Sequence, residues 1–352
     1  MENIVYFTGA GFSAGLGVPV MSNFIEKSKD LYFSDPVKFN NFTEIYDMMR
    51  KMSFIKSYIN SDMLNIEEVL SLIEMESYVA GTGLVDKYKD YIKAVISHYT
   101  PVCKPKPDIK GTNYTSFYSS LVSEEYVNYE KFFLTLNGCR LIREQLDNSS
   151  EPWIYFSEPA EDNSHCYSII TVNYDLVIEN IYSSINGALE NDFKLNIDSD
   201  GPHISKLHGS LNSEIVMPTW NKRSSSEISG EWKKAYTFLK EANQIRILGY
   251  SLPQSDNYIK YLFAVAINAS ENLRNIDVIT LDDENGSTED RYSNFFVFPK
   301  LRFKNDSLEN YLRFILQDGT IPQLQNHNRK QIYDFANVLE NTRTGHEKYM
   351  IS

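Results

Sequence analysis

The stretch "NIVYFTGAGFSAGLGVPV", residues 3–20, decides the fold expected for this chain. Its apolar start, 4–7, predicts a buried strand, because strands covered on both faces read as unbroken apolar runs. The glycine-rich segment 8–11 then predicts a tight turn into a helix. Glycines in such a turn let backbone pass close to a ligand, and a helix that starts there offers N–H groups to a pyrophosphate. The alternative is a tight strand-to-helix turn without a ligand.

The bulk properties are those of an ordinary globular protein: 352 residues, 42% hydrophobic and 23% charged. This length favours two lobes, at roughly 150 residues each. The net charge of −13 argues against a broad nucleic-acid surface, which needs clustered Lys and Arg, but allows a small anionic ligand. No apolar run approaches the roughly 18 residues of a membrane span, and no N-terminal leader is seen, so we expect no membrane contact.

The three cysteines, Cys103, Cys139 and Cys166, are scattered and odd in number. We therefore expect neither a disulfide framework nor a four-thiolate zinc site in this chain. The histidines outside position 208 also lack metal-ligand spacing, so we expect no metal. A reducing cytoplasm is the expected location.

From residue 167 onward, strands and helices alternate. Strands are predicted within 167–175, 204–211, 214–220, 244–252 and 276–284, with helices between most of them. This alternation favours an α/β fold: a Rossmann-like parallel sheet with helices on both faces. The first strand, in 1–21, joins the same sheet, so we assign 1–21 and 167–320 to one nucleotide-binding core.

A large, mainly helical lobe, 22–166, is inserted between the first two strands. Helical spacing is clear in 65–77 and 85–99, and helix is also expected in "TSFYSSLVSE" (115–124) and "FFLTLNGCRLIREQL" (132–146). The remaining residues, 321–352, are expected to form a C-terminal helical tail.

Parallel strands end at one edge of a sheet, and ligands bind outside that edge. Asn173 and Asp175 lie at the end of one predicted strand. An Asn can orient a water or a ribose hydroxyl, and an Asp can accept from a carboxamide N–H. Alternatively, Asp175 only caps the following helix. His208 follows another strand, where a histidine taken alone is more often structural.

A further strand end, in "LGYSLPQSD" (248–256), adds a glycine and a serine that can hold ribose or phosphate. Alternatively this is an ordinary turn, with Asp256 capping the next helix. A dehydrogenase-type dinucleotide fingerprint is only partly matched, because position 14 is alanine and no acidic residue ends a second strand about 20 residues later.

Taken together and in order, these segments resemble the sirtuin superfamily. The family pattern Gly-Ala-Gly-x-Ser-x-x-x-Gly-x-Pro is matched by Gly9, Ala10, Gly11, Ser13, Gly17 and Pro19. Shorter motifs match at Asn173 and Asp175, at His208 and Gly209, and at Gly249, Ser251 and Leu252. The resemblance covers the sheet core and leaves the inserted lobe unexplained.

Two features depart from the protein-deacylating sirtuins. Val20, Met21 and Ser22 replace the Asp-Phe-Arg that follows the proline, and the paired Cys-x-x-Cys of the zinc module is missing. The segments "NIEEVL", "KLHGSLN", "MPTWNK" and "ILGYSLPQSD" look more like the sirtuin-like NAD hydrolases of bacterial antiviral defence. That resemblance implies an enzyme that cleaves NAD+ to nicotinamide and ADP-ribose and so stops the infected cell.

The resemblance implies three catalytic residues: Asp175 holds the carboxamide, Asn173 positions the ribose or water, and His208 acts as general base. NAD is the substrate, and no metal is needed. The residues expected to contact NAD are Gly9, Ala10, Gly11, Phe12, Ser13, Gly17, Pro19, Gly209, Gly249, Ser251 and Asp282. The diphosphate would lie against Ser13 and the backbone N–H groups of 10–13.

Other activities use the same site: a protein deacylase, an ADP-ribosyltransferase, or a non-catalytic sensor of NAD or ADP-ribose. An unrestrained NAD hydrolase would kill its host, so its activity must be held off. We therefore expect a homo-oligomer, or a separately encoded activator such as a DNA-translocating ATPase or an Argonaute-like protein.

Overall fold

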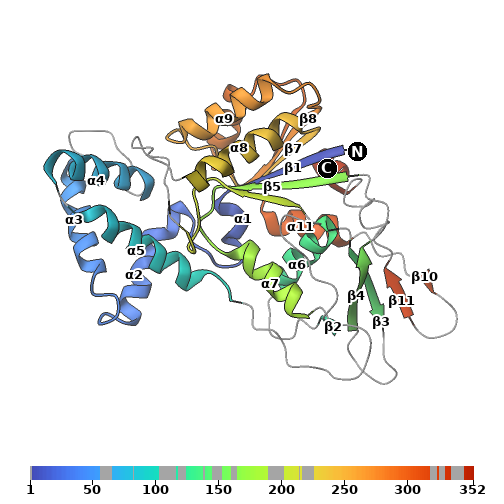
Figure 1. The fold of residues 1–352 in the computed structure, drawn as a ribbon, viewed down its shortest axis with the longest axis horizontal. Coiled ribbons are helices and arrows are strands. Elements are labelled where there is room, and N and C mark those ends of the chain that lie inside the picture. The colour runs from blue at the N-terminus through green and yellow to red at the C-terminus, as the bar shows by residue number, and fades with distance from the viewer. Residues whose placement is uncertain are drawn as a thin grey trace.

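The computed structural model contains two β-sheets, and helices pack around the one that includes β1, β5, β7 and β8 (Figure 1). It describes residues 2–55, 66–81, 83–102, 116–117, 124–137, 139–144, 153–159, 165–188, 202–213, 215, 226–317, 323–324, 330–333 and 345–352. Within these residues, a six-stranded sheet carries the strand ends on which the functional prediction depends.

The six-stranded sheet has the strand order β6-β5-β1-β7-β8-β9, and every neighbouring pair is parallel. Its strands are β1 (Glu2–Thr8), β5 (His165–Thr171), β6 (His203–Lys206), β7 (Gln244–Leu248), β8 (Asn275–Thr280) and β9 (Leu301–Asn305). The chain builds outward from β1 on one side and then returns to build outward on the other, as in a doubly wound Rossmann sheet. The predicted Rossmann-like parallel sheet is therefore confirmed.

Helices cover both faces of this sheet, which explains the unbroken apolar run 4–7 of β1. In β1, Ile4 and Tyr6 point into one half of the core, and Val5 and Phe7 point into the other. The first half is covered by α6 (Glu124–Leu136), α7 (Val177–Ala188) and α11 (Leu308–Gln317). The second is covered by α8 (Ser226–Glu241), α9 (Asn257–Asn268) and α10 (Ser287–Phe295).

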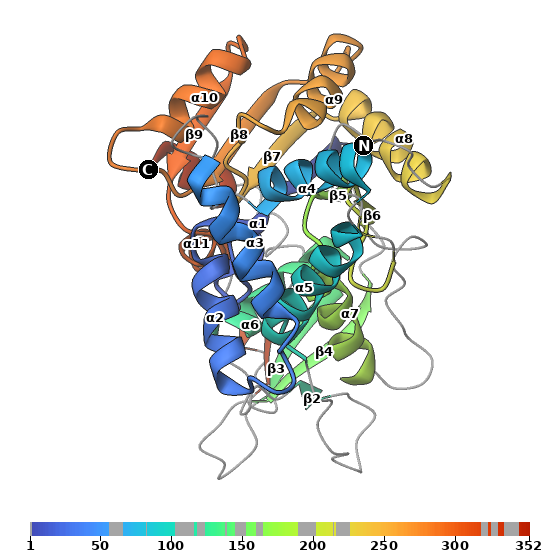
Figure 2. The same ribbon diagram turned by 90° about the vertical axis from the view of Figure 1, so that its left-hand side faces the viewer.

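The N-terminal part of the predicted lobe is helical, as expected. After the short helix α1 (Ala10–Ala14) and the turn η1 (Met21–Asn23), the chain forms α2 (Phe24–Ser34), α3 (Phe42–Ile55), α4 (Ile66–Ala80) and α5 (Leu84–Tyr99). These four helices lie together at the left-hand end of the molecule in Figure 1 and face the viewer in Figure 2. Buried aromatic rings join them, for example Phe42 and Tyr91, whose centroids are 4.8 Å apart. No described helix has the length and apolar character that a bilayer span requires.

The second sheet corrects the sequence prediction for the rest of the lobe and for the tail. Its order is β10-β11-β3-β4-β2, formed by β2 (Ser116–Phe117), β3 (Cys139–Glu144), β4 (Trp153–Pro159), β10 (Gln323–Leu324) and β11 (Lys330–Tyr333). The helix expected through 132–146 ends at Leu136, and 139–144 is strand. The residue pair Asn137-Gly138 favours such an end.

Long-range pairing explains why this sheet escaped prediction. β3 is flanked by β4 and by β11, which lies almost two hundred residues further along the chain. The tail thus contributes two strands, and its described helical part is 345–351. The helix expected in 115–124 is likewise strand at Ser116–Phe117. The strand expected in 214–220 lies outside the described residues, apart from Ile215, and the division into core, lobe and tail stays a prediction.

The turn after β1 packs directly on the turn after β7, at the point where the sheet changes its winding direction. Gly11 N–H donates to the Gly249 carbonyl at 2.8 Å. A Cβ on Gly249 would lie 2.4 Å from the Gly11 carbonyl carbon, and a Cβ on Gly11 would lie 2.8 Å from Gly249 Cα. Gly249 also has φ +62°, in the left-handed region. These two glycines are therefore required by the approach of the two turns, whatever else they bind.

We predict that Gly249→Ala destabilises the protein more than Gly286→Ala. Both glycines have positive φ, at +62° and +70°, so both substitutions carry a left-handed penalty of about 1–2 kcal/mol. Only Gly249→Ala also forces a Cβ into the backbone of the β1 turn, whereas a Cβ on Gly286 meets nothing within 4 Å. Overpacking adds a further ~1–3 kcal/mol. Urea unfolding of both variants measures the difference, and equal free energies of unfolding would contradict this account.

Candidate functional site

The ends of β1 and β5 meet at the carboxyl edge of the six-stranded sheet. Asn173 donates a hydrogen bond from Nδ2 to the Gly9 carbonyl at 2.9 Å, although the two residues are 164 positions apart. The same nitrogen lies 3.2 Å from Ser13 Oγ. The structure thus brings together two of the segments that the sequence marked as functional.

These contacts fix which way the Asn173 amide faces. The Gly9 carbonyl can only accept, so the Asn173 atom beside it must be the NH2 group. The backbone N–H of Asn173 donates to Thr171 Oγ1 at 3.1 Å and holds the residue from the other side. Within the described residues, Asn173 Oδ1 accepts no hydrogen bond. Asn173 therefore presents a positioned acceptor at the edge of the sheet.

Ser13 links Asn173 to Asp175. Its side chain is 1% exposed, and its hydroxyl bonds the Asp175 carboxylate as well as the Asn173 amide. Burial raises the pKa of Asp175, while Lys206, the Val177 N–H and the Ser13 hydroxyl act in the opposite direction. Asp175 Oδ1 accepts from the Val177 N–H at 3.0 Å, which is the helix-capping role considered for it from the sequence.

Lys206 supports this loop and was not identified from the sequence. Its Nζ donates to the Asp175 carbonyl at 2.6 Å and to Glu179 Oε1 at 2.8 Å. The side chain reaches from the end of β6 to the start of α7, so the contact depends on the neighbouring positions of β5 and β6. No local signal in the sequence indicates it.

His208 lies beside the Asn173–Asp175 loop. Its ring stacks on Tyr174, with centroids 5.7 Å apart and an interplanar angle of 28°. The Leu211 N–H donates to the Tyr174 carbonyl, and Trp232 Nε1 donates to the Leu207 carbonyl at 3.0 Å. His208 is 2% exposed, so its imidazole is held inside the structure next to the predicted catalytic loop.

The turn expected to hold a diphosphate is already used in part by the protein itself. Gly11 N–H donates to Gly249, Phe12 N–H donates to the Gly9 carbonyl, and the Ser13 hydroxyl faces Asn173 and Asp175. Ala10 is exposed. Within the predicted diphosphate-binding segment 10–13, only Ala10 is exposed. Gly11, Phe12 and Ser13 make hydrogen bonds inside the protein.

The other predicted contacts lie on the same edge or close to it. Gly249 and Ser251 follow β7, and the Ser251 carbonyl accepts from Arg291 Nε at 3.0 Å. Asp282 follows β8, and its carboxylate accepts from the backbone N–H groups of Thr288 and Glu289 at 2.7 and 2.9 Å. Asp282 thus caps α10, and a contact between it and NAD stays a prediction.

Three further predicted residues are in turns near these ends. Gly17 and Gly209 have φ of +91° and +74°, so their backbones take a conformation that favours glycine. Pro19 is buried after the α1 turn.

Asp256, the expected cap of α9, is at the N-cap position, but its carboxylate accepts from the Tyr250 hydroxyl at 2.5 Å and caps no backbone N–H.

A second polar cluster lies on one face of the same sheet, away from the strand ends. Tyr6, Arg246, Asp277 and Arg302 are direct register partners on four adjacent strands. Arg246 Nη1 donates to the Tyr6 hydroxyl at 2.8 Å. Arg302 binds both Asp277 oxygens, at 2.6 and 2.8 Å. A row of polar and charged side chains thus crosses this face of the sheet, with Gln244 and Asn275 bonded to Arg246 and Asp277.

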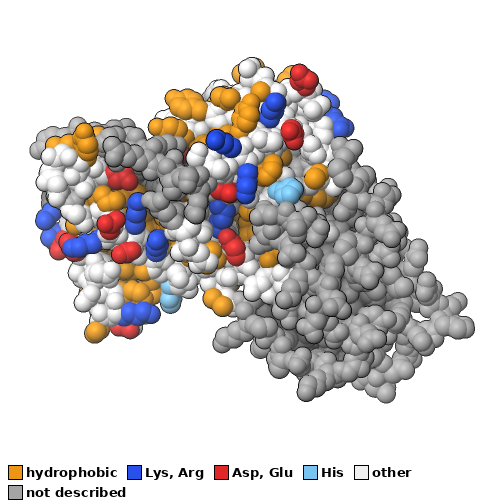
Figure 3. Space-filling model, in the orientation of Figure 1, with side chains coloured by type: hydrophobic (Ala, Val, Ile, Leu, Met, Phe, Trp, Pro, Cys, Tyr) orange, Lys and Arg blue, Asp and Glu red, His pale blue; other side chains and the backbone are white. Residues whose placement is uncertain are grey.

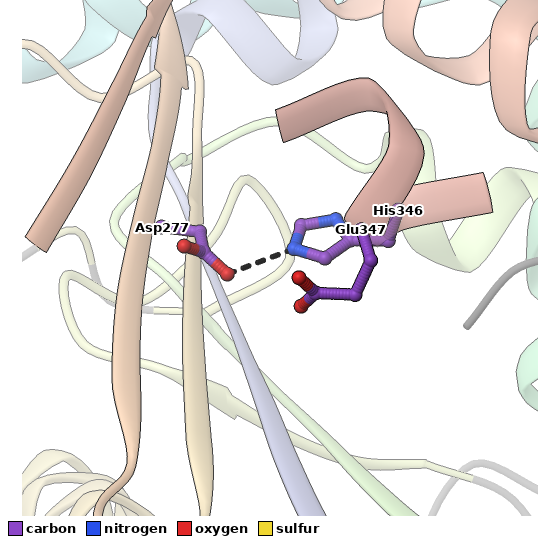
Figure 4. Close-up of side chains that lie close together, drawn as sticks. All are labelled: Asp277, His346 and Glu347. Atoms are coloured by element: carbon purple, nitrogen blue, oxygen red, sulfur yellow. Dashed lines mark hydrogen bonds and ion pairs between the residues drawn. The ribbon is translucent and has the colours of Figure 1, made fainter. Parts of the chain in front are cut away.

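The C-terminal helical residues 345–351 cover this row (Figure 4). His346 Nε2 lies 2.8 Å from Asp277 Oδ2, and Glu347 pairs with Arg302 at 2.7 Å. Because the carboxylate accepts, Nε2 carries the proton, and Nδ1 accepts from the Tyr311 hydroxyl at 3.0 Å.

Asp277, His346 and Glu347 have ligand atoms within 4.8 Å of one another, as a metal site would. Arg302 already supplies the positive charge that the two carboxylates need, and it holds both oxygens of Asp277. An ion-pair network therefore explains these side chains without a metal ion. The sequence prediction missed the network, because His346 and Asp277 are 69 positions apart.

Comparison with known proteins gives one family match. Residues 167–310 match the family model of the SIR2-like domain, which supports a place in the sirtuin superfamily. This region contains Asn173, Asp175, His208 and Gly249. A search of curated proteins finds no match.

Several solved sirtuin structures are similar at low identity. Sir2 with the inhibitor EX-527, 2′-O-acetyl-ADP-ribose and deacetylated p53 peptide shares 12% identity, covering 90% of this chain and 94% of that chain, with a TM-score of 0.33. Sir2 with p53 peptide and NAD+ shares 13%, over 90% and 93%, at 0.33. Sir2Tm with a propionylated peptide shares 12%, over 90% and 93%, at 0.32. At such scores the fold assignment rests on the strand order given above.

On the face shown in Figure 3, Lys and Arg side chains are interspersed with Asp and Glu over the described elements. The expectation that the protein has no direct nucleic-acid surface stays a prediction, as does the absence of a metal.

We predict that His346 makes a contribution to stability that is lost as the pH falls from 6.5 to about 4. Burial, with the nearby Arg246, lowers the pKa of His346 from 6.5 to about 4. Between these values the unfolded histidine takes up a proton that the folded one does not, so the contribution of His346 is fully present above pH 6.5 and is lost below it. The loss amounts to as much as about 3 kcal/mol.

Urea unfolding across this pH range tests the prediction. His346→Gln keeps a donor toward Asp277 and should remove this contribution, because glutamine does not titrate. Burial raises the pKa of Glu130 to about 8, and its opposing contribution is present in both proteins, so the difference between them reports His346. His98→Gln, on the exposed surface of α5, is the control and should keep the slope of the parent. A parent slope unchanged by His346→Gln would contradict the assignment.

Proposed function

We propose that this protein hydrolyses NAD+ to nicotinamide and ADP-ribose, and that it serves as an effector of bacterial antiviral defence. The SIR2-like match supports an NAD-dependent function of the sirtuin kind. One observation carries the proposal of hydrolysis: the Asn173 amide is locked by Gly9 and Ser13 so that its Oδ1 faces outward as a hydrogen-bond acceptor. That arrangement suits a water or a ribose hydroxyl.

The substrate would lie across the strand ends where β1 meets β7, the usual ligand position in a doubly wound sheet. The exposed Ala10 and the turn after β7 would face its phosphates. The nicotinamide ribose would lie toward Asn173 and His208. The exclusion of bulk water from this buried edge would strengthen the electrostatic contacts.

Cleavage would break the bond between the ribose C1′ and the nicotinamide nitrogen. The electron pair of this bond returns to the nicotinamide ring, and the ribose passes through an oxocarbenium-like state, as in sugar hydrolysis. Asn173 Oδ1 would accept a hydrogen bond from the attacking water or from a ribose hydroxyl. His208 would take the proton as general base, since imidazole titrates near neutrality. The products are nicotinamide, ADP-ribose and one proton.

Asp175 has a double role in this proposal. One of its oxygens caps α7 through Val177, its carboxylate also accepts from the Ser13 hydroxyl, and Lys206 binds its backbone carbonyl. Its remaining acceptor capacity would bind the nicotinamide carboxamide. Substitution of Asp175 is therefore expected to change both the shape of the loop and the binding of NAD.

Such an activity needs restraint in the cytoplasm. We propose control through assembly of a homo-oligomer or through a separately encoded activator such as a DNA-translocating ATPase or an Argonaute-like protein. The native mass of the protein alone and in the presence of the products of neighbouring genes tests this point.

We predict that Asn173→Ala and His208→Ala each lower NAD cleavage roughly 10²- to 10⁴-fold, the usual contribution of one acid–base or orienting side chain. NAD affinity, measured by calorimetry, should largely remain. Asn180→Ala is the control, because the Asn180 side chain also donates to a backbone carbonyl at 2.8 Å, but to that of Pro101 and not to the turn after β1.

The assay measures nicotinamide, ADP-ribose and label transferred to protein in the same reaction. Free ADP-ribose in equal amount to nicotinamide supports hydrolysis. Label on protein would indicate ADP-ribosyl transfer instead, and nicotinamide release that requires an acylated peptide would indicate deacylation. Turnover at the parent rate in both Asn173→Ala and His208→Ala would refute the proposed catalytic roles.

We further predict that chelation by EDTA leaves turnover unchanged. The proposed reaction uses only an amide, an imidazole and a carboxylate of the protein, and glycosidic cleavage of this type requires no Lewis acid. The measurement is nicotinamide release before and after dialysis against EDTA. Loss of activity that added zinc restores would contradict this prediction and show that the site binds a catalytic metal ion.

A further inference from the structure

Tyr129 on α6 contacts the turn that follows β1. Its hydroxyl donates a hydrogen bond to the Phe12 carbonyl, and its ring packs edge-on against Phe12, with centroids 5.3 Å apart. Both side chains are buried, at 0% and 1% exposure. The contact joins residues 117 positions apart, one in the inserted segment and one in the nucleotide-binding core.

The accepting carbonyl belongs to the peptide unit that links Phe12 to Ser13. A peptide unit is planar, so a hydrogen bond to its oxygen also fixes the direction of the Ser13 N–Cα bond. α1 is only five residues long, and its N-cap has no side-chain hydrogen bond. Short helices are marginal by themselves, so the orientation of α1 depends on contacts from outside.

Ser13 passes this orientation on to the predicted catalytic loop. Its buried hydroxyl bonds the Asn173 amide and the Asp175 carboxylate. Rotation of the Phe12–Ser13 peptide would move that hydroxyl, and Asn173 Nδ2 would lose one of its two hydrogen-bond acceptors, the other being the Gly9 carbonyl.

Tyr129 is itself firmly held. Phe132 packs edge-on against Tyr6 at 5.2 Å, and Phe133 against Tyr182 at 5.4 Å, so α6 is attached to the sheet and to α7. Burial, with the nearby carboxylates of Glu309 and Asp175, raises the pKa of Tyr129 well above its usual value. The hydroxyl therefore stays protonated and remains a donor.

We propose that Tyr129 is a positioning residue for the NAD cleavage proposed above: by holding the Phe12–Ser13 peptide it fixes Ser13, and through Ser13 it orients Asn173. The inference rests on the proposed function for its catalytic consequence. α6 thereby connects the inserted segment to the site, because a shift of α6 would reach Asn173 through two hydrogen bonds.

The test compares Tyr129→Phe with Tyr88→Phe. Both tyrosines are 0% exposed, and both donate to a backbone carbonyl, since the Tyr88 hydroxyl bonds Ile66 at 3.1 Å on the helical lobe. Each substitution removes one hydroxyl and leaves the ring in place. Loss of stability alone should therefore be similar in the two variants and is measured by urea unfolding.

We expect Tyr129→Phe to lower kcat for NAD cleavage roughly 10- to 100-fold, the cost of a small misplacement of a catalytic group. KM should change little, because the loss concerns an interaction that orients a catalytic group. Tyr88→Phe should keep the parent kcat. Hydrogen exchange should become faster in peptides covering 9–17 and 171–176 in Tyr129→Phe only.

Three outcomes would overturn the proposal: a parent-like kcat in Tyr129→Phe, an equal fall of kcat in both variants, or unchanged exchange around Ser13 and Asn173. If the parent protein cleaves no NAD under any condition, the proposed function fails. Hydrogen exchange then still decides whether Tyr129 holds Ser13 and Asn173, since that measurement needs no turnover.

Discussion

The contact between two glycine turns determines the architecture of the candidate site. Gly11 and Gly249 touch through backbone atoms, where β1 and β7 lie side by side and the sheet reverses its direction of winding. A side chain at either position would push the turns apart. Their contact fixes the Gly9 carbonyl, which in turn fixes Asn173. The spacing of the turns therefore sets the geometry of the polar groups around them.

A different requirement applies at the centre of the sheet, where buried charged side chains need hydrogen-bond or ion-pair partners. Isolated charges in such a position would cost several kcal/mol each. Arg246 donates hydrogen bonds to Tyr6 and Gln244. Asp277 accepts hydrogen bonds from Arg302, Asn275 and His346. Part of this compensation comes from the last residues of the chain. The C-terminal helical residues 345–351 thus pack against the sheet and supply partners for its buried charges.

The site is built from three separate sources. The turn after β1 contributes Ser13, and the SIR2-like region contributes Asn173, Asp175 and His208. Helix α6 of the inserted segment contributes Tyr129. Helix α6 packs on the sheet like the other covering helices, so the insertion is continuous with the core at this point. This continuity gives a physical route by which events in the insertion can affect Asn173.

The sequence by itself determined the alternation of strands and helices, the turn after β1 and the gathering of Asn173, Asp175 and His208 at one edge. Periodicity and turn residues are local, and parallel strands end on the same side. Only the tertiary structure decided that Ser13 faces inward to Asn173, that Gly11 meets Gly249, and that Cys139–Glu144 is a strand. Lys206, Tyr129 and the Asp277–His346 pair also depended on it. Each of these contacts joins residues distant in the chain, and their partners are chosen by packing, which no local pattern encodes.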